Sequence, residues 1–320
     1  MSDVVAIAHR PQSSHDGDAR VIAELGFEGE IDILREEIAR WIAQSSEEMR
    51  EALDWQFLGR SKYFRPLTIF SCYRAVYGEP IPPRVIESAL VIELFHNVSL
   101  IIDDILDHSR YRRDKLTLHC RFGNLRALMT AGYVMADGYR IVCQDAHSIR
   151  LFSELMSRLG AAECLQWRLR QQPLGVEDWR KIAGEDTGTM FEVCACLGAR
   201  TEQLRQFGHL LGVLYHGCDD VGDVRGASAL GGGGQEDIRD GILTLPASLA
   251  IRDPAVASMF RDPSERNQKS IATAFQKQLP EAEAYLDRIA SEARQEAKLF
   301  STNPEPLYAL VDHTRRLSQR

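Results

Sequence analysis

The segment from residue 84 to residue 107 reads RVIESALVIELFHNVSLIIDDILD. Its apolar residues cover most of the circumference of a helix, which is typical of a helix buried at the centre of a protein. Prolines at 80, 82 and 83 precede it and favour a helix start there. We therefore predict a central helix over residues 84–106, in which Glu93 and His96 are unusual polar residues.

This central helix ends in an acidic triplet, Asp103, Asp104 and Asp107. The spacing places Asp103 and Asp107 on one helix face, with Asp104 offset by one residue. Carboxylates that close a buried helix repel one another and resist ionisation. A divalent cation relieves that cost, and Mg²⁺ is commonly held by one or two carboxylates together with phosphate oxygens and water. One such triplet is a weak signal, because acidic helix faces are common.

A second triplet with the same spacing ends the helix that we expect over residues 202–224. It consists of Asp219, Asp220 and Asp223. Arginine side chains fit phosphate oxygens well, and the first triplet is followed closely by cationic residues. These are Arg110, Arg112, Arg113 and Lys115. Acid, metal and arginine together indicate a site for a diphosphate more than a metal store or a hydrolytic dyad.

Helical spacing of apolar residues continues along the rest of the chain, without a comparable stretch of alternating apolar and polar residues. We expect residues 1–20 to form a flexible tail and residues 21–320 to form a single all-α domain. Further helices are expected from residue 27, from residue 66, over 125–144, 148–159 and 176–198, and from residue 249 onward. A glycine-rich stretch, 226–234, is either a lid over the site or a plain linker.

Composition excludes several other classes of protein. The chain has 320 residues and a net charge of −8, which argues against a general nucleic-acid binder. The longest apolar stretch, 88–102, is interrupted by Glu93 and His96, so we expect no membrane span. Seven scattered cysteines without a C-x-x-C pair indicate neither a zinc site nor a disulfide framework. We expect a soluble, cytoplasmic protein.

Basic residues also occur at the start of the helix expected from residue 66. Lys62 and Arg65 are three positions apart, so their charged groups can converge on one anion. Alternatively, they are a solvated helix start. The role of His96 also has two interpretations: it is either a core histidine or a ligand-binding group two turns before Asp103.

With its two triplets and the sequence LFHNVSLIIDD at 94–104, the chain resembles the trans-isoprenyl diphosphate synthases, which include the farnesyl and geranylgeranyl diphosphate synthases. The resemblance extends from about Gly59 to Pro246 and looks closest to the geranylgeranyl type. It implies an isoprenoid synthase fold, in which antiparallel helices surround a deep central cavity, and usually a homodimer. The implied reaction joins isopentenyl diphosphate head-to-tail to a C5–C15 allylic diphosphate.

The resemblance also implies roles for individual residues. Asp103, Asp107 and Asp219 would bind Mg²⁺, three ions in all, with Asp104, Asp220 and Asp223 in support. Arg112 would contact the allylic diphosphate, and Thr187 would belong to the catalytic site. The diphosphate of isopentenyl diphosphate would be bound by Lys62, Arg65, His96 and Arg113.

Departures from the family pattern concern the allylic side of this site. The family usually has lysines where this chain has Asp186 and Ile242, and a glutamine where it has His216. In the motif around Lys62, Tyr63 replaces an arginine, and Arg60 and Ser61 replace two glycines. Each lost charge-assisted hydrogen bond costs roughly 1.5–3 kcal/mol. We therefore expect an altered allylic preference or a slower reaction.

Product length is expected to depend on the residues just before the first triplet. In the family the positions of Val98 and Ser99 line the cavity floor, and small residues there leave room for growth. We predict geranylgeranyl diphosphate (C20) as the main product, with Phe95 or Ile92 setting a deeper floor. Two alternatives remain open: a terpene cyclase on the same scaffold, and a weakly active regulatory subunit of a heteromeric synthase.

Overall fold

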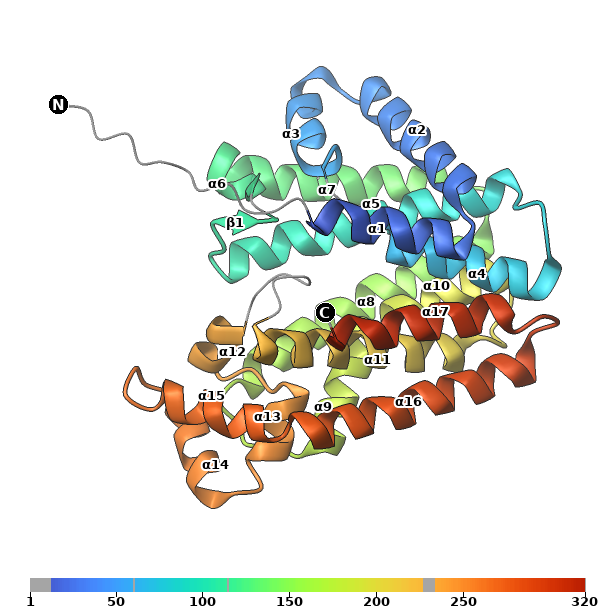
Figure 1. Ribbon diagram of the computed structural model, residues 1–320. Helices are drawn as coiled ribbons and strands as arrows, with labels where there is room; N and C mark the ends of the chain where they lie inside the picture. The colour runs from blue at the N-terminus through green and yellow to red at the C-terminus, as the bar shows by residue number, and fades with distance from the viewer. Residues whose placement is uncertain (1–12, 60, 114, 227–233, 320) are drawn as a thin grey trace.

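The computed structural model describes residues 13–59, 61–113, 115–226 and 234–319 (Figure 1). Within these ranges the chain is almost entirely helical, which confirms the all-α prediction. The long helices are α2 (Glu28–Gln44), α4 (Phe64–Tyr77), α5 (Pro83–Leu106), α7 (Asn124–Ile141), α8 (Ala146–Leu169), α11 (Arg205–Arg225) and α16 (Leu279–Phe300). Shorter helices are α1 (Ser13–Leu25), α3 (Glu47–Phe57), α6 (Leu118–Phe122), α9 (Val176–Ala183), α10 (Thr189–Ala199), α12 (Gly234–Asp240), α13 (Leu245–Ala250), α14 (Pro254–Arg261), α15 (Gln268–Lys277) and α17 (Glu305–Arg315).

Helix α5 lies where the sequence predicts it, and its apolar residues are buried on most sides. It begins at Pro83, where the missing N–H of proline costs no helical hydrogen bond. Helices α2, α4 and α7 pack against it. Gly138 allows the close approach of α7, because a Cβ there would lie 2.4 Å from the ring of Phe95. The buried apolar residues of the described chain form one continuous core around these helices.

Four local features differ from the sequence expectation. Residues 13–20, expected to be a tail, begin helix α1, whose Val21, Ile22 and Leu25 are buried; residues 1–12 lie outside the described residues. Helix α8 continues to Leu169, ten residues beyond its predicted end at 159. Between α9 and α10 the expected continuous helix contains a π-helical turn, η1 (Gly184–Gly188). After the first triplet, β1 (Tyr111–Arg112) and β2 (Lys115–Leu116) form a small antiparallel hairpin.

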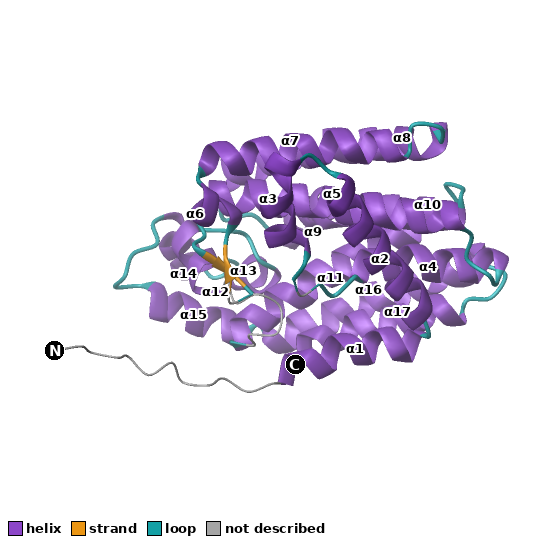
Figure 2. Cartoon of the chain, turned by 90° about the horizontal axis from the view of Figure 1, so that it is seen from above, coloured by secondary structure: helices purple, strands orange, loops and turns teal. Residues whose placement is uncertain are grey.

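The arrangement of helices is clearest from above, where α7 and α8 form one edge of the molecule and α1 lies at the opposite edge (Figure 2). By length and composition alone, α5 could cross a membrane, but 67% of its most apolar stretch is buried inside the protein. Such burial is typical of the core helix of a soluble protein. Most of the glycine-rich stretch, residues 227–233, lies outside the described residues, so its role as lid or linker stays open.

Candidate active site

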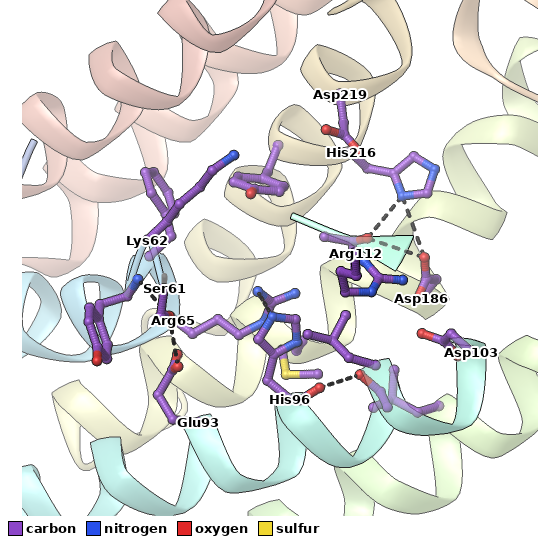
Figure 3. A pocket seen from close by; sticks show the side chains of 18 of the residues that line it. Ser61, Lys62, Arg65, Glu93, His96, Asp103, Arg112, Asp186, His216 and Asp219 are labelled. Carbon is purple, nitrogen blue, oxygen red and sulfur yellow. Dashed lines mark hydrogen bonds and ion pairs between the residues drawn. The ribbon is translucent and has the colours of Figure 1, made fainter. Parts of the chain in front are cut away.

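A polar cavity of about 300 Å³ opens between the helices that carry the two acidic triplets (Figure 3). Its walls come from the segment before α4, from α5, α8, η1, α10 and α11, and from the hairpin. The predicted site residues that line it are Lys62, Arg65, His96, Ser99, Asp103, Arg112, Arg113, Thr187 and Asp219. Segments more than a hundred residues apart in the sequence therefore meet in one cavity.

One side of the cavity is built from cationic and donor groups. Lys62, Arg65 and His96 gather there from the start of α4 and from α5 (Figure 3). Tyr63, which precedes α4, adopts the left-handed conformation with φ of 49°, a rare state for a residue with a side chain. Such backbone strain is often found where a functional site is held in place.

Arg65 and His96 are in direct contact at this side. Arg65 Nη1 donates a hydrogen bond of 3.1 Å to His96 Nε2, so the ring proton of the neutral histidine is on Nδ1. Burial and the neighbouring Arg65 hold the pKa of His96 well below its usual value, which keeps the ring neutral. His96 Nδ1 and Arg65 Nε are buried without a hydrogen-bond partner among the described residues. Buried donors normally have a hydrogen-bond partner, and an anionic ligand in the cavity could accept hydrogen bonds from these two N–H groups.

Glu93 is also close to this group, and it is almost fully buried in α5. Its Oε2 accepts a hydrogen bond of 3.1 Å from Ser61, one of the residues that replace a family glycine. Burial raises the pKa of Glu93 above its ordinary value, although Arg65 lowers it. The polar residue that interrupts the apolar sequence of α5 thus helps to fix the segment before α4.

The three carboxylates of the first triplet point to different partners. Asp103 lines the cavity. Asp104 is buried and accepts a hydrogen bond of 2.8 Å from Arg112 Nε, which ties the hairpin to α5. Asp107 accepts a hydrogen bond of 3.0 Å from Arg170 at the end of α8. Neither Asp104 nor Asp107 lines the cavity, so their metal-binding roles stay predictions.

The second triplet shows the same division of roles. Asp219 lines the cavity opposite Asp103 (Figure 3). Asp220 Oδ2 instead accepts two hydrogen bonds of 2.8 Å, from Trp179 Nε1 and from the backbone N–H of Leu245. Asp220 therefore anchors the start of α13 to α11. Asp223 does not line the cavity, and its predicted metal role stays untested.

The electrostatics of the cavity favour a bound cation. Burial and the neighbouring carboxylates Glu163 and Asp186 raise the pKa of Asp103 to about 8. Burial, with Asp186 and Asp107, raises the pKa of Glu163 to about 7. Burial and Asp223 raise the pKa of Asp219 to about 7. A cation bound in the cavity would favour the ionised form of these carboxylates and so relieve their mutual repulsion.

Among the described residues, no group of three or more His, Cys, Asp or Glu side chains converges on one point where a metal ion could be held. Asp103 and Asp219 face the cavity from two different helices. Mg²⁺ commonly takes one or two carboxylates and completes its shell with phosphate oxygens and water. The donors present therefore fit divalent ions that are shared between the protein and a diphosphate.

The wall between the triplets contains the main departures from the family pattern. Asp186 and Thr187 come from η1 and His216 from α11, and all three line the cavity. Burial lowers the pKa of His216, but Asp220 and Asp186 outweigh it and raise the pKa to about 9. The second missing lysine, at Ile242, lies after α12, outside the cavity lining.

Only one of the residues predicted to set the product length lines the cavity. Ser99 lines the cavity, whereas Val98 and Phe95 are fully buried in the core and do not. Leu100, Leu159 and Met190 are apolar residues that do line the cavity.

Sequence reasoning missed several lining residues, among them Leu159, Glu163, Met190 and Tyr215. Leu159, Glu163 and Met190 are far from both triplets along the chain, whereas Tyr215 lies one helical turn before Asp219, where an aromatic residue is read as part of the core. Glu163 was missed because the helix was predicted to end at residue 159, whereas α8 continues to Leu169 and places this acidic residue against the cavity.

The comparisons with known proteins agree with this geometry. A family model described as polyprenyl synthetase matches residues 46–279. The chain belongs to the polyprenyl synthetase family. It is 26% identical over 296 residues to a nonaprenyl diphosphate synthase of Mycobacterium tuberculosis, which covers 85% of this chain and 88% of the relative. It is 27% identical over 245 residues to geranylgeranyl pyrophosphate synthase 4 of Arabidopsis thaliana, covering 69% and 65%.

Solved structures share the fold at low sequence identity. A polyprenyl synthase from Caulobacter crescentus, complexed with calcium and isoprenyl diphosphate, superimposes with a TM-score of 0.82 at 20% identity, covering 98% of this chain and 99% of the other. A heptaprenyl diphosphate synthase from Staphylococcus aureus gives a TM-score of 0.81 at 21% identity, covering 91% and 98%. The isoprenoid synthase fold is therefore confirmed, and family membership gives the reaction class, trans-prenyl transfer.

Proposed function

We propose that this polyprenyl synthetase condenses isopentenyl diphosphate with an allylic diphosphate in a Mg²⁺-dependent reaction, with geranylgeranyl diphosphate as the main product. The observation that carries the proposal is that one cavity is lined both by Arg65 and His96 and by Asp103 and Asp219 (Figure 3). Two diphosphate substrates require two anion sites, and only the allylic substrate needs to lose its diphosphate to form a cation. The cavity offers one site made of donors and another made of carboxylates suited to metal ions.

Each part of the cavity has a task in this chemistry. Bound Mg²⁺ would neutralise the allylic diphosphate as it leaves. Asp103 and Asp219 would hold the ions, three in our prediction, and Arg112 would add a cationic contact. The orphaned donors of Arg65 and His96 would hold the diphosphate of isopentenyl diphosphate. The apolar residues Leu159 and Met190 would exclude water from the allylic cation.

A donor site for a second diphosphate separates this proposal from a terpene cyclase. A cyclase ionises one diphosphate and has no use for Arg65 and His96 in contact beside the cavity. The relatives include a nonaprenyl diphosphate synthase and a geranylgeranyl pyrophosphate synthase, so the product length is proposed from the cavity. We propose C20 because Ser99 is small and leaves room for growth, while the larger apolar residues Leu159 and Met190 also line the cavity.

We also propose a cytoplasmic homodimer. Helix α7 lies at one edge of the molecule and exposes Leu125, Leu128 and Met129, whose side chains recur at helical spacing (Figure 2). A second copy of the chain would cover this apolar face. Sedimentation equilibrium of the wild type and of Met129→Glu tests the dimer, which the charged variant should weaken.

One experiment tests the proposed reaction. Purified protein is incubated with MgCl₂, isopentenyl diphosphate and dimethylallyl, geranyl or farnesyl diphosphate, and products are identified before and after phosphatase treatment. Linear C20 alcohols released by phosphatase support the proposal. Hydrocarbons formed without isopentenyl diphosphate indicate a cyclase, and the absence of any product indicates a regulatory subunit. A linear product of another length overturns only the C20 assignment.

A further inference from the structure

Asp186 poses an electrostatic problem for a cavity that binds a diphosphate. Its carboxylate lines the same cavity as Asp103 and Glu163 (Figure 3). Divalent ions can balance Asp103, which belongs to a triplet, but Asp186 comes from η1 and has no acidic triplet around it. An uncompensated carboxylate beside a diphosphate would oppose its binding, because like charges at short range repel strongly in a partly buried site.

The contacts of Asp186 show how this charge is compensated. Thr187 Oγ1 donates a hydrogen bond of 3.2 Å to Asp186 Oδ2. The only hydroxyl proton of Thr187 is used in this bond, so His216 Nδ1, at 2.9 Å from Thr187 Oγ1, must be the donor in that contact. His216 Nδ1 is also 3.5 Å from Asp186 Oδ2. Two successive hydrogen bonds thus connect His216 to Thr187 and Thr187 to the carboxylate of Asp186.

The fold fixes this chain of hydrogen bonds from both ends. Gly212 of α11 lies against Gly188 of η1 so closely that a Cβ on Gly212 would be 2.6 Å from Gly188 Cα. His216 lies one helical turn after Gly212 and on the same face, which brings its ring beside Thr187. On its other side, His216 Nε2 is 3.8 Å from Asp220, whose second oxygen is held by Trp179 and Leu245.

We propose that Asp186, Thr187 and His216 act as one hydrogen-bonded unit that shields the carboxylate of Asp186 and so permits the allylic diphosphate to bind beside it. The inference rests on the proposed function and assigns His216 and Thr187 as positioning residues for the allylic substrate. The aspartate at 186 and the histidine at 216 are then coupled: the histidine matters for binding because the aspartate is there.

A double-mutant cycle tests this coupling. His216→Phe keeps a ring of similar size but removes both nitrogens, and we expect the KM for geranyl diphosphate to rise about tenfold. Asp186→Asn should lower that KM. In the double variant D186N/H216F the KM should return to within about threefold of the D186N value. The conservative His216→Gln keeps an N–H donor and should show a smaller rise than His216→Phe.

Several readouts separate positioning from a general loss of structure. The KM for isopentenyl diphosphate should change little in every variant, because its expected site around Arg65 and His96 lies on the other side of the cavity. Thr187→Val removes the middle of the chain without touching the histidine, and D186N should rescue it as well. Thermal melting checks folding, and if His216→Phe fails to fold, the cycle of T187V with D186N takes its place.

The outcomes are clear-cut. Rescue by D186N supports the inference. If H216F and T187V raise the KM by the same factor in the D186N background as in the wild-type background, or if both substrates are affected equally, the inference is wrong. Should the wild type form no elongated product at all, the proposed function fails instead. The same cycle is then measured by calorimetric binding of inorganic pyrophosphate with MgCl₂, where the same rescue or its absence decides the inference.

Discussion

Arg170 Nη2 donates a hydrogen bond of 3.0 Å to Asp107 Oδ1, which joins the end of α8 to the first acidic triplet. Arg170 Nη1 is also 3.9 Å from Asp240 Oδ2, in the segment that follows the glycine-rich stretch. The guanidinium group stacks over the ring of Trp167, with Cζ 3.9 Å from the ring centroid. A carboxylate expected to bind Mg²⁺ is thus hydrogen-bonded to an arginine.

This contact predicts that Arg170 competes with Mg²⁺ for Asp107. Arg170→Gln should lower the half-saturating Mg²⁺ concentration by about 1.4- to fivefold, because a partly exposed ion pair contributes about 0.2–1 kcal/mol. Initial rates over a range of MgCl₂ concentrations, together with calorimetric Mg²⁺ binding in the presence of inorganic pyrophosphate, give the value. Arg168→Gln, an exposed arginine two residues away, is the matched control. An unchanged or higher Mg²⁺ requirement in R170Q would rule out competition.

Asp103 and Asp219, the two triplet carboxylates that line the cavity, should respond to metal more than the other triplet carboxylates. Mg²⁺ with inorganic pyrophosphate should raise the free energy of unfolding by about 2.7 kcal/mol at a hundred times the Kd. Asp103→Asn and Asp219→Asn should each remove most of this gain, because their side chains line the cavity. Urea unfolding with and without the ligands measures it. The exposed Glu177→Gln variant should keep the full gain; an equal gain in all three variants would show that the two aspartates hold no metal.

Product length should depend on the apolar residues that line the cavity. Leu159→Ala and Met190→Ala enlarge it and should extend the product by about one isoprene unit, because cavity volume limits chain growth. Ser99→Phe should shorten the product. Chromatography of the dephosphorylated alcohols gives the chain length. Leu151→Ala, on α8 but buried away from the cavity, is the control, and it should destabilise the protein without changing the product.

The sequence predicted the fold and the acidic half of the site because both are local patterns. A long, almost wholly apolar stretch predicted α5, and equal i, i+1, i+4 spacing identified the triplets around Asp103 and Asp219. The same spacing could not show that Asp104 and Asp220 would be used to fix the hairpin and α13. Those partners come from other parts of the chain, and only packing decides which carboxylate of a triplet faces the cavity.

The departures from the family pattern show the same limit. Asp186 and His216 could each be recognised as unusual, but they are thirty positions apart in the sequence. Their contact depends on the π-helical turn η1 and on the close approach of Gly212 to Gly188. Neither a π-turn nor a glycine contact between helices has a periodic signature in one sequence. The compensation of one departure by the other was therefore visible only in three dimensions.

Behind η1, a buried charge network predicts a pH-dependent stability. Glu192 accepts hydrogen bonds from Arg158 (2.8 Å) and Arg205 (3.0 Å), and His209 Nδ1 lies 2.9 Å from it. Burial alone would raise its pKa, but His209 and Arg158 outweigh burial and lower the pKa of Glu192 to about 2. The folded state therefore binds this proton less tightly than the unfolded chain, whose glutamate pKa is about 4.3.

The consequence is a stability contribution that is present above a pH of about 4.3 and disappears as the pH falls towards about 2. Glu192→Gln should lower the free energy of unfolding by about 3 kcal/mol at pH 7, because it leaves two partly buried arginines without their carboxylate. The difference in the free energy of unfolding between wild type and variant should shrink as the pH falls below the pKa of glutamate in the unfolded chain. Urea unfolding at pH 3 to 8 measures both, with the exposed Glu36→Gln as control. A difference that stays constant down to pH 3 would contradict the assignment.

The contact between Gly212 and Gly188 gives the last prediction. A Cβ on Gly212 would lie 2.6 Å from Gly188 Cα and 2.8 Å from the carbonyl oxygen of Thr187, and both are backbone atoms that cannot rotate away. Gly212→Ala should therefore lower the free energy of unfolding by about 1–3 kcal/mol, the usual cost of overpacking. It should also raise the KM for geranyl diphosphate, since η1 and α11 move apart and His216 leaves Thr187.

Gly160→Ala is the matched control for this variant. Gly160 also lies inside a long helix, α8, but a Cβ there would have nothing within 4 Å. Because alanine is the better helix former, G160A should be neutral or more stable by up to about 1 kcal/mol, with both KM values unchanged. If G212A behaved like G160A in urea unfolding and in steady-state kinetics, the close approach of α11 to η1 would not be what positions His216.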